Sequence, residues 1–367
     1  PPMSLLFRTI VKNVAVPICF AMAALSALLL LGRLVPLLET LLRAGVTPGE
    51  LGHFLLLLIP TFLVLVVPMA SLIGVVVGFL RMSRDSEVLA LLACGVGPLR
   101  LVLPVAAVAL VTWAATFATA ATVLPMSKKA TGAFIRNLTE RRIARGLPEK
   151  TFLLPVPTLA MYVHKSRKNG RILQGVYMVD ARDLKHLQVV LARWGEIFSR
   201  PGSGEVILRL SDGVFHPAEA DPRVSDTLFF RSYMLRLAFR DTGGLPSRGE
   251  MGLRELAAFA ARRNLAPDDH RRYVVELHKR LALPVGAFIL TLLGMPLGIL
   301  FGRTGLSGGV ALGLGAFLSY YLLVAVGANL AEAGTLPPAA LWAPNLVFAA
   351  ATAWLLRHLH RRGPVRG

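Results

Sequence analysis

Seven basic side chains stand where long apolar runs begin or end, and they are the side chains best suited to hold a ligand. Guanidinium and ammonium groups pair with phosphate oxygens through charge-assisted hydrogen bonds. A phosphorylated amphiphile would place its phosphates against these cations and its acyl chains between the apolar segments. A plainer role is also open, because basic side chains at a bilayer edge extend towards lipid headgroups. The seven residues are Arg33, Arg43, Lys128, Lys129, Arg136, Lys279 and Arg280.

A second stretch, from Arg81 to Arg100, is strongly polarised and lies between two long apolar runs. Polar and acidic side chains open it, which favours a helix N-terminus, and an apolar stretch follows before glycines and a proline end it. The pattern predicts a short surface helix over about residues 84–95, which a partner outside the bilayer could grip and move. An ordinary solvated turn is the alternative interpretation. The opening side chains are Ser83, Arg84, Asp85, Ser86 and Glu87, and Leu91 lies in the apolar part.

The sequence has neither the pattern of a nucleotide-binding loop nor that of a zinc protease. The P-loop and H-E-x-x-H patterns do not occur. His358 and His360 lie in a basic tail, where solvation is a simpler interpretation than metal binding. Cys19 and Cys94 are too far apart in the chain to suggest a disulfide framework. We therefore expect no catalytic residue, no metal site and no cofactor in this chain.

The composition is that of a polytopic membrane protein. Hydrophobic residues make up 54% of the 367 residues and charged residues only 17%, yet the formal net charge is +19. In a soluble protein such a charge would suggest nucleic acid, but no nucleic-acid-binding motif is present, so we expect no such partner. In a membrane protein the charge fits lipid headgroups, an anionic substrate or cytoplasmic loops.

Six apolar runs are long enough to cross a bilayer. Pairs of glycines spaced four residues apart predict close helix packing within them, and the pair Tyr320-Tyr321 is predicted to pack inside the fifth run. The runs are Val14–Leu31, Phe54–Leu80, Leu101–Leu124, Leu281–Phe301, Val310–Leu330 and Ala339–Leu356. The glycine pairs are Gly74 with Gly78, Gly298 with Gly302, and Gly309 with Gly313.

The stretch from Pro125 to about His270 lacks a long apolar run. It has short alternating or β-rich runs separated by turn residues such as Asn169-Gly170, which predicts an antiparallel β domain, most simply a sandwich or jelly roll. The chain then divides into helices 1–3 (residues 1–124), a β domain with a connecting helix (125–270) and helices 4–6 with a basic tail (271–367). The β-rich runs are Leu159–Val163, Ile172–Val179, Leu187–Trp194, Glu205–Leu210 and Leu228–Phe239.

Lysine and arginine in the short connections predict the orientation. The N-terminus, the 81–100 connection, Arg303 and the C-terminal tail are basic and fall on one side of a six-span chain. The connection Glu332–Pro338 on the other side has no basic residue. The positive-inside rule therefore predicts cytoplasmic termini and an extracytoplasmic β domain, which in a bacterium is periplasmic.

In four stretches, and in their order and spacing over almost the whole chain, the sequence resembles the LptF/LptG family of lipopolysaccharide export permeases. The stretches are Arg84-Asp-Ser-Glu-Val-Leu-Ala-Leu with Gly95, Glu276-Leu-His-Lys-Arg-Leu-Ala-Leu-Pro284, Gly294-Met-Pro-Leu-Gly298, and Gly334-Thr-Leu-Pro-Pro with Trp342-Ala-Pro-Asn345. The patterns Ile59-Pro60 and Val67-Pro68-Met69-Ala70 look more like the F-type subunit than the G-type.

The resemblance implies that two related permeases form a cavity open to the outer leaflet of the bacterial inner membrane. A dimeric cytoplasmic ATPase, which binds ATP and Mg, would drive them, and jelly-roll β domains would pass lipopolysaccharide to a periplasmic bridge protein. On this sequence it implies that residues 84–95 form the coupling helix, that Glu87 docks on the ATPase, and that Arg33 stands at a position linked to substrate phosphates. Further coupling residues would be Arg84, Asp85 and Leu91.

Other functions remain open at this stage. A permease of the mechanotransmission type would act on periplasmic partners without moving lipid, and it would share the large insert between spans 3 and 4. A scaffold for envelope assembly would leave the polarised 81–100 stretch without a purpose. A membrane-embedded enzyme is the weakest alternative, because no acid–base or metal pair lies in the spans.

Overall fold

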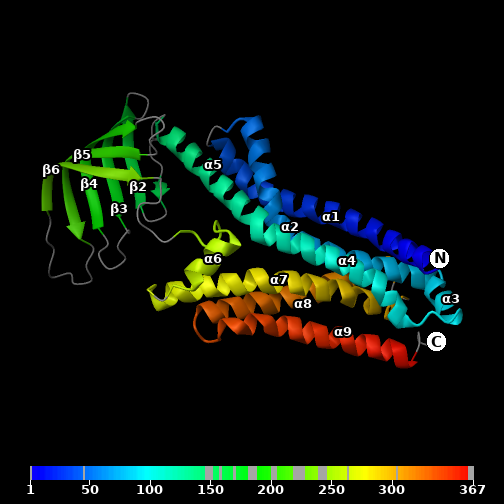
Figure 1. Ribbon diagram of the computed structural model, residues 1–367. Helices are drawn as coiled ribbons and strands as arrows, with labels where there is room; N and C mark the ends of the chain where they lie inside the picture. The colour runs from blue at the N-terminus through cyan, green and yellow to red at the C-terminus, as the bar shows by residue number, and fades with distance from the viewer. Residues whose placement is uncertain are drawn as a thin grey trace. The chain divides into compact units, whose positions relative to one another are not determined.

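The computed structural model divides into two compact units (Figure 1). Residues 1–42, 46–130 and 247–367 form one, here called the membrane unit, and residues 43–45 and 131–246 form the other, the β unit. The residues that the structure describes are 2–43, 46–144, 152–156, 159–167, 171–180, 188–199, 205–217, 228–238, 246–262, 264–302 and 305–362.

Six helical stretches of the described chain are long and apolar enough to cross a membrane, which confirms the six predicted spans. They are Leu5–Val35, Pro48–Arg84, Pro98–Leu138, Pro267–Leu300, Gly305–Glu332 and Pro338–Arg361. The helices are α1 (Pro2–Arg43), α2 (Pro48–Arg84), α3 (Glu87–Ala93), α4 (Pro98–Ala118), η1 (Thr119–Val123), α5 (Leu124–Ala144), α6 (Leu253–Ala260), α7 (Pro267–Leu300), α8 (Gly305–Glu332), η2 (Pro338–Trp342) and α9 (Ala343–Arg362).

Helix α2 is packed against α1, α7 and α8 at glycines. A Cβ atom on Gly78 of α2 would lie 3.0 Å from the carbonyl oxygen of Asn13 in α1. On Gly298 of α7 it would lie 2.6 Å from the carbonyl oxygen of Val76, and on Gly313 of α8 it would lie 3.0 Å from a side-chain carbon of Ile73. Small residues let helix backbones approach this closely, so the predicted close-packing surfaces are confirmed.

The third span, which the sequence predicts as a single run, is interrupted by an irregular turn. Between α4 and α5 the five residues of η1 (Thr119–Val123) form a π-helix. The hydroxyl of Thr119 donates to the carbonyl oxygen of Ala115 at 2.7 Å, and that of Thr122 donates to the carbonyl oxygen of Ala118 at 2.7 Å. Such bonds to the preceding turn satisfy the hydroxyls in an apolar surrounding and often accompany helix irregularity.

The β unit is an antiparallel sheet of six strands, each paired with its neighbour in the sequence. The predicted class, six spans with an antiparallel β domain between spans 3 and 4, is confirmed. The described strands form one sheet in meander order, without the Greek-key order of a jelly roll. The strands are β1 (Phe152–Val156), β2 (Leu159–Arg167), β3 (Ile172–Asp180), β4 (Gln188–Ser199), β5 (Glu205–Pro217) and β6 (Leu228–Ala238).

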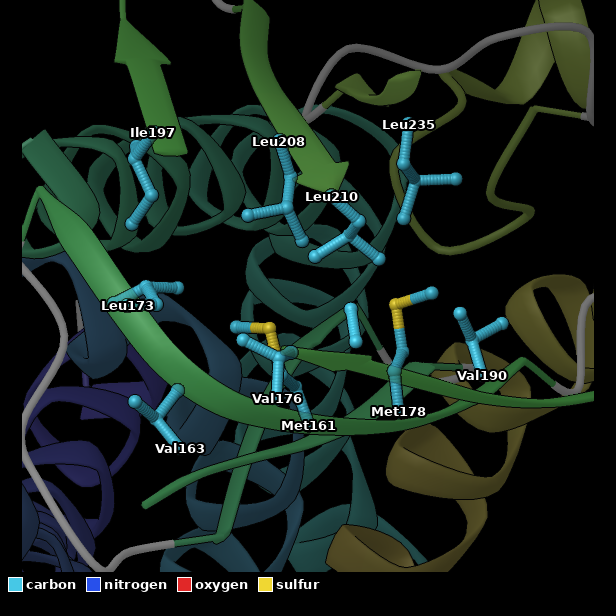
Figure 2. Close-up of a cluster of buried hydrophobic side chains, with 11 residues drawn as sticks. Met161, Val163, Leu173, Val176, Met178, Val190, Ile197, Leu208, Leu210 and Leu235 are labelled. Carbon is cyan, nitrogen blue, oxygen red and sulfur yellow. The ribbon is translucent and has the colours of Figure 1, made fainter. Parts of the chain in front are cut away.

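The sheet bends around its core at Gly175. Leu173 and Val176 of β3 are both buried although they are three residues apart, so the alternation of buried side chains shifts by one between them. Gly175 has a φ of +66°, which a glycine adopts without strain. Figure 2 shows side chains from different strands, such as Met178 of β3 and Leu210 of β5, gathered in one apolar cluster.

The connecting helix belongs with the membrane unit and not with the β domain, where the sequence had placed it. Leu256 of α6 is fully buried and forms one apolar cluster with Met251 and Tyr273 of α7. The contact-based boundary therefore falls at residue 246, well before the predicted 270. The amphipathic pattern of α6 predicted a helix but could not show which apolar surface would cover it.

Candidate functional site

A cavity of about 240 Å³ lies among α2, the η1–α5 stretch, α7 and α8 of the membrane unit. Its walls are mostly apolar, and charged side chains line one part of it. The apolar and aromatic lining includes Val64, Leu65, Pro68, Ala120, Leu124, Leu283, Phe317, Tyr320 and Tyr321. The charged lining residues are Lys128, Glu276, Lys279 and Arg280. An apolar cavity with a few convergent polar groups is the usual form of a ligand site.

Lys128 and Lys279 have no hydrogen-bond or ion-pair partner among the described residues, and both side chains are partly buried. Lys128 lies within the electrostatic range of Glu276, Lys279 and Arg280. The lining therefore holds three cations and one carboxylate, and the carboxylate is already paired with Arg280. Positive charge beside apolar walls favours an anion that can neutralise it.

Arg280 is placed differently from the two lysines, because its guanidinium donates four hydrogen bonds to the protein. Only 3% of its surface is exposed. Nε donates to Glu276 at 3.0 Å, Nη1 to the carbonyl oxygen of Met251 at 2.6 Å and Nη2 to that of Arg248 at 2.8 Å. A further bond from Nη2 reaches the carbonyl oxygen of Gly249 at 3.3 Å. With four hydrogen bonds to protein oxygens, Arg280 serves mainly the architecture of the site.

The other predicted basic residues do not line this cavity. Lys129 pairs with Glu255 of α6 at 3.6 Å, and both side chains are exposed. Arg33 lies exposed on α1. The side chain of Arg43 lies outside the described residues, and Arg136 is in the part of α5 that belongs to the β unit. Of the seven, the structure thus brings together Lys128, Lys279 and Arg280.

Two stretches that carry the family resemblance meet in the membrane unit. The indole of Trp342 donates to His278 Nδ1 at 3.1 Å, and the amide of Asn345 donates to the carbonyl oxygen of Ala282 at 3.0 Å. Asn345 in turn accepts from the hydroxyl of Tyr320 at 2.8 Å. Sequence reasoning missed this polar network and the role of Glu276, although the spacing of Glu276 and Arg280 on one helix face could have indicated their pairing.

The short helix predicted over residues 84–95 is present as the shorter α3 (Glu87–Ala93), after α2 has ended at Arg84. It ends as expected at Gly95, which has a φ of +83°, and the amide of Val96 bonds to the carbonyl oxygen of Leu91 at 3.0 Å. The expected capping by a polar side chain is absent, because Ser86 at the N-cap makes no such hydrogen bond. Here α3 starts directly from the end of α2, so its position is fixed mainly by packing.

One face of α3 is anchored and the other is exposed. Val88 is buried, and the partly buried Leu91, one of the predicted coupling residues, packs against the same apolar cluster. Leu89 is 58% exposed and stands two residues after Glu87, which is also exposed. In Figure 1, α3 lies at the same end of the membrane unit as the start of α1 and the end of α9. Exposed residues in this region include Arg84, Asp85, Glu87 and Leu89.

The β unit offers a second, shallow hollow of about 930 Å³ on the face opposite to its core. A row of side chains crosses the strands there: Tyr162, Tyr177, Leu191, Val214 and Phe229 are successive register partners.

Among the described residues, no group of three or more His, Cys, Asp or Glu side chains is arranged to hold a metal ion.

Comparison with known proteins identifies a matching family and a similar protein. The family model "Lipopolysaccharide export system permease LptF/LptG" matches residues 8–358. An uncharacterized protein of Rickettsia prowazekii (strain Madrid E) is 22% identical over 298 residues, which cover 79% of this chain and 81% of that protein. The family model covers F-type and G-type subunits together and does not separate them.

Proposed function

This chain belongs to the LptF/LptG family of lipopolysaccharide export permeases, and from that premise we propose that it is one half of a two-permease, ATP-driven lipopolysaccharide extractor. Family membership and six spans make it a multi-pass subunit of a bacterial inner-membrane ABC transporter that works with partner subunits. The proposed extractor takes lipopolysaccharide from the outer leaflet of the inner membrane. It passes the lipid to a periplasmic bridge protein that leads to the outer membrane.

The observation that carries the proposal is the pair Lys128 and Lys279 in an apolar cavity. Two ammonium groups without a described partner suit a phosphate, and the walls around Leu65 and Phe317 suit part of an acyl chain. The cavity is small, so it would take one phosphate and its neighbouring apolar part while the rest of the lipid lies between the two permeases. We propose that Arg33, Arg43, Lys129 and Arg136 add positive charge along that route.

The energetic problem of extraction explains why apolar surfaces are needed. Each acyl CH₂ that leaves the bilayer costs about 0.8 kcal/mol unless another apolar surface receives it. The β unit has apolar surface both in its core and on strand β6, where Phe229 is 83% exposed. We propose that an apolar surface of the β unit receives the lipid after it leaves the membrane unit.

The movement produced by ATP hydrolysis would be transmitted to this chain through α3. We propose that Arg84, Asp85, Glu87 and Leu89 dock on a cytoplasmic ATPase dimer that binds ATP and Mg, while this chain itself catalyses nothing. Support comes from the exposed Glu87 and Leu89 on a helix whose other face packs against the bundle, and from the exposed Arg84 and Asp85 before it. Both termini would be cytoplasmic, since the start of α1 and the end of α9 share this end with α3, and the β unit would be periplasmic. The leaning towards an F-type subunit remains a prediction.

The test is to co-express the chain with a related permease and a candidate ATPase, and to read the purified complex by native mass spectrometry. We expect two permeases, two ATPases and bound lipopolysaccharide. Replacing both lysines, Lys128→Gln with Lys279→Gln, should lower the amount of bound lipid but leave the assembly intact. Arg254→Gln, an exposed change on α6, is the matched control. A complex that contains the ATPase but never lipid would favour the mechanotransmission alternative.

A further inference from the structure

The segment that leads back from the β unit into the membrane unit is held by several polar contacts. This return segment, Ser247–Ala260, includes α6 and is the first part of the membrane unit after the β unit. It begins with a turn in which the amide of Glu250 bonds to the carbonyl oxygen of Ser247 at 2.9 Å. Each end of the segment is then tied to another helix.

Arg280 of α7 provides the central tie. Its guanidinium bonds to the carbonyl oxygens of Arg248, Gly249 and Met251, and Glu276 holds it from the other side. The planar fork of arginine can serve several fixed acceptors at once, whereas the single ammonium of lysine cannot keep the same geometry. The backbone of the return segment is therefore fixed to the helix that lines the cavity.

Two further ties bind the same segment to other helices. Arg248 pairs with Glu332 at the end of α8 through two bonds, Nη1–Oε1 at 2.7 Å and Nη2–Oε2 at 3.2 Å. Glu255 of α6 pairs with Lys129 of α5 at 3.6 Å. The return segment thus links α5, α7 and α8, which all contribute to the cavity or border it.

The cavity and the ties share residues. Arg280 lines the cavity and holds the return segment, and the side chain of Lys128 lies across Gly249, where a Cβ atom would be 2.9 Å from Nζ. An anion that draws Lys128 into the cavity therefore acts on a side chain that touches the return segment. Packed contacts of this kind can carry a change at one site to a neighbouring element.

We infer that Arg280 is a positioning residue for lipid handover: it couples the cavity to the return segment, and so to the chain that carries the β unit. This inference rests on the proposed function, because it needs lipid to pass from the cavity to the β unit. It assigns Arg280 no contact with the substrate. Loss of the fork should leave lipid binding in the cavity intact and reduce its transfer.

The experiment uses the assembled transporter in nanodiscs that contain lipopolysaccharide, with a photoreactive benzoylphenylalanine at one of two positions. Position 321 lines the cavity, and position 233 packs against the core of the β unit. With ATP, Arg280→Lys should keep the crosslink at 321 within about twofold and lower that at 233 about tenfold, since hydrogen bonds from a charged donor are lost. Arg254→Lys, the same change at an exposed position on α6, should alter neither crosslink.

The outcomes separate the two proposals. Unchanged crosslinks at both positions in Arg280→Lys overturn the inference, and so does a parallel fall of both crosslinks with the yield of folded complex. If Arg280→Lys fails to assemble, Glu332→Gln is used instead, because it weakens the ion pair with Arg248. It should lower the crosslink at position 233 about two- to fivefold. An unchanged crosslink at position 233 refutes the coupling. A parent transporter without any crosslink at 321 contradicts the proposed function itself.

Discussion

Replacing Gly298 by alanine tests whether α2 and α7 are held together at backbone contact. A Cβ atom on Gly298 would lie 2.6 Å from the carbonyl oxygen of Val76 and 2.8 Å from Cβ of Phe79. Neither atom can swing away, because one belongs to the backbone and the other is fixed by its own Cα. The two helices must therefore separate, and the apolar contacts along their shared surface weaken.

The expected magnitude follows from two opposing terms. Overpacking of a tight core costs about 1–3 kcal/mol, and alanine is favoured over glycine inside a helix by about 1 kcal/mol. We therefore expect Gly298→Ala to lower the free energy of unfolding by up to about 2 kcal/mol. The matched control is Gly315→Ala in α8, where nothing lies within 4 Å of the added Cβ, so only the helix preference should act.

The assay is the unfolding of each purified variant by titration with SDS in mixed micelles, followed by circular dichroism. Gly298→Ala should unfold at a lower SDS fraction than the parent chain, and Gly315→Ala at the same or a higher fraction. Equal midpoints for the two variants would refute the argument, because then the close approach of α2 and α7 would contribute nothing measurable to stability.

Three further predictions concern the polar network, the coupling surface and the orientation. Tyr320→Phe removes the hydroxyl that donates a hydrogen bond to Asn345, and it should lower the free energy of unfolding by about 0.6 kcal/mol in the same SDS titration. Tyr321→Phe, at a tyrosine without a described hydrogen bond, is the control. Equal shifts of the midpoint in the two variants would count against the network. Glu87→Lys should leave folding unchanged but lower lipid transfer per ATP hydrolysed in proteoliposomes, and unchanged transfer would remove Glu87 from the coupling surface. An alkaline phosphatase fused after Gly202 should be active, and an inactive fusion would reverse the proposed topology.

The spans could be predicted because length and apolar composition are local properties. A run such as Val310–Leu330 needs no knowledge of its neighbours to be recognised as long enough for a bilayer. The structure places a helix over each predicted run and extends several of them, as with α1, which continues to Arg43. The glycine pairs were also informative, because a missing side chain has few other uses within an apolar helix.

The prediction of the β strands was less complete than that of the spans, for physical reasons. Strand β1 was missed because Pro155 interrupts a short run and removes a backbone donor. The bend at Gly175 could not be foreseen, since the shift in alternation depends on how the whole sheet closes over its core. The sequence also could not show that α6 would pack on α7, because an amphipathic helix defines a buried face but not what covers it.

The sequence also could not show which face of the short helix α3 points towards the bundle. Leu89 and Leu91 stand two residues apart on α3, and both are suitable for docking by residue type. Only the packing of Val88 and Leu91 against the bundle decides that Leu89 is exposed. A helix of seven residues is too short for its apolar pattern to fix which side faces inward.

The basic residues show how chemical type and tertiary context together decide a role. Lys279 and Arg280 are adjacent in sequence and both line the cavity, so their spacing predicts the same function for both. Arginine presents a rigid fork that suits several fixed carbonyl oxygens, and Arg280 meets three of them in a segment about 30 residues away in the chain.

Lysine is a flexible point charge that suits a ligand which arrives and leaves, and Lys128 and Lys279 keep their ammonium groups without a described partner. Exchanging the types should therefore damage the two positions differently. Arg280→Lys should disturb the return segment, whereas Lys279→Arg should leave that segment in place and hold a phosphate more tightly, which slows its release. A bound lipid that persists through ATP turnover in Lys279→Arg, but not in Arg280→Lys, is the result that this division of roles requires.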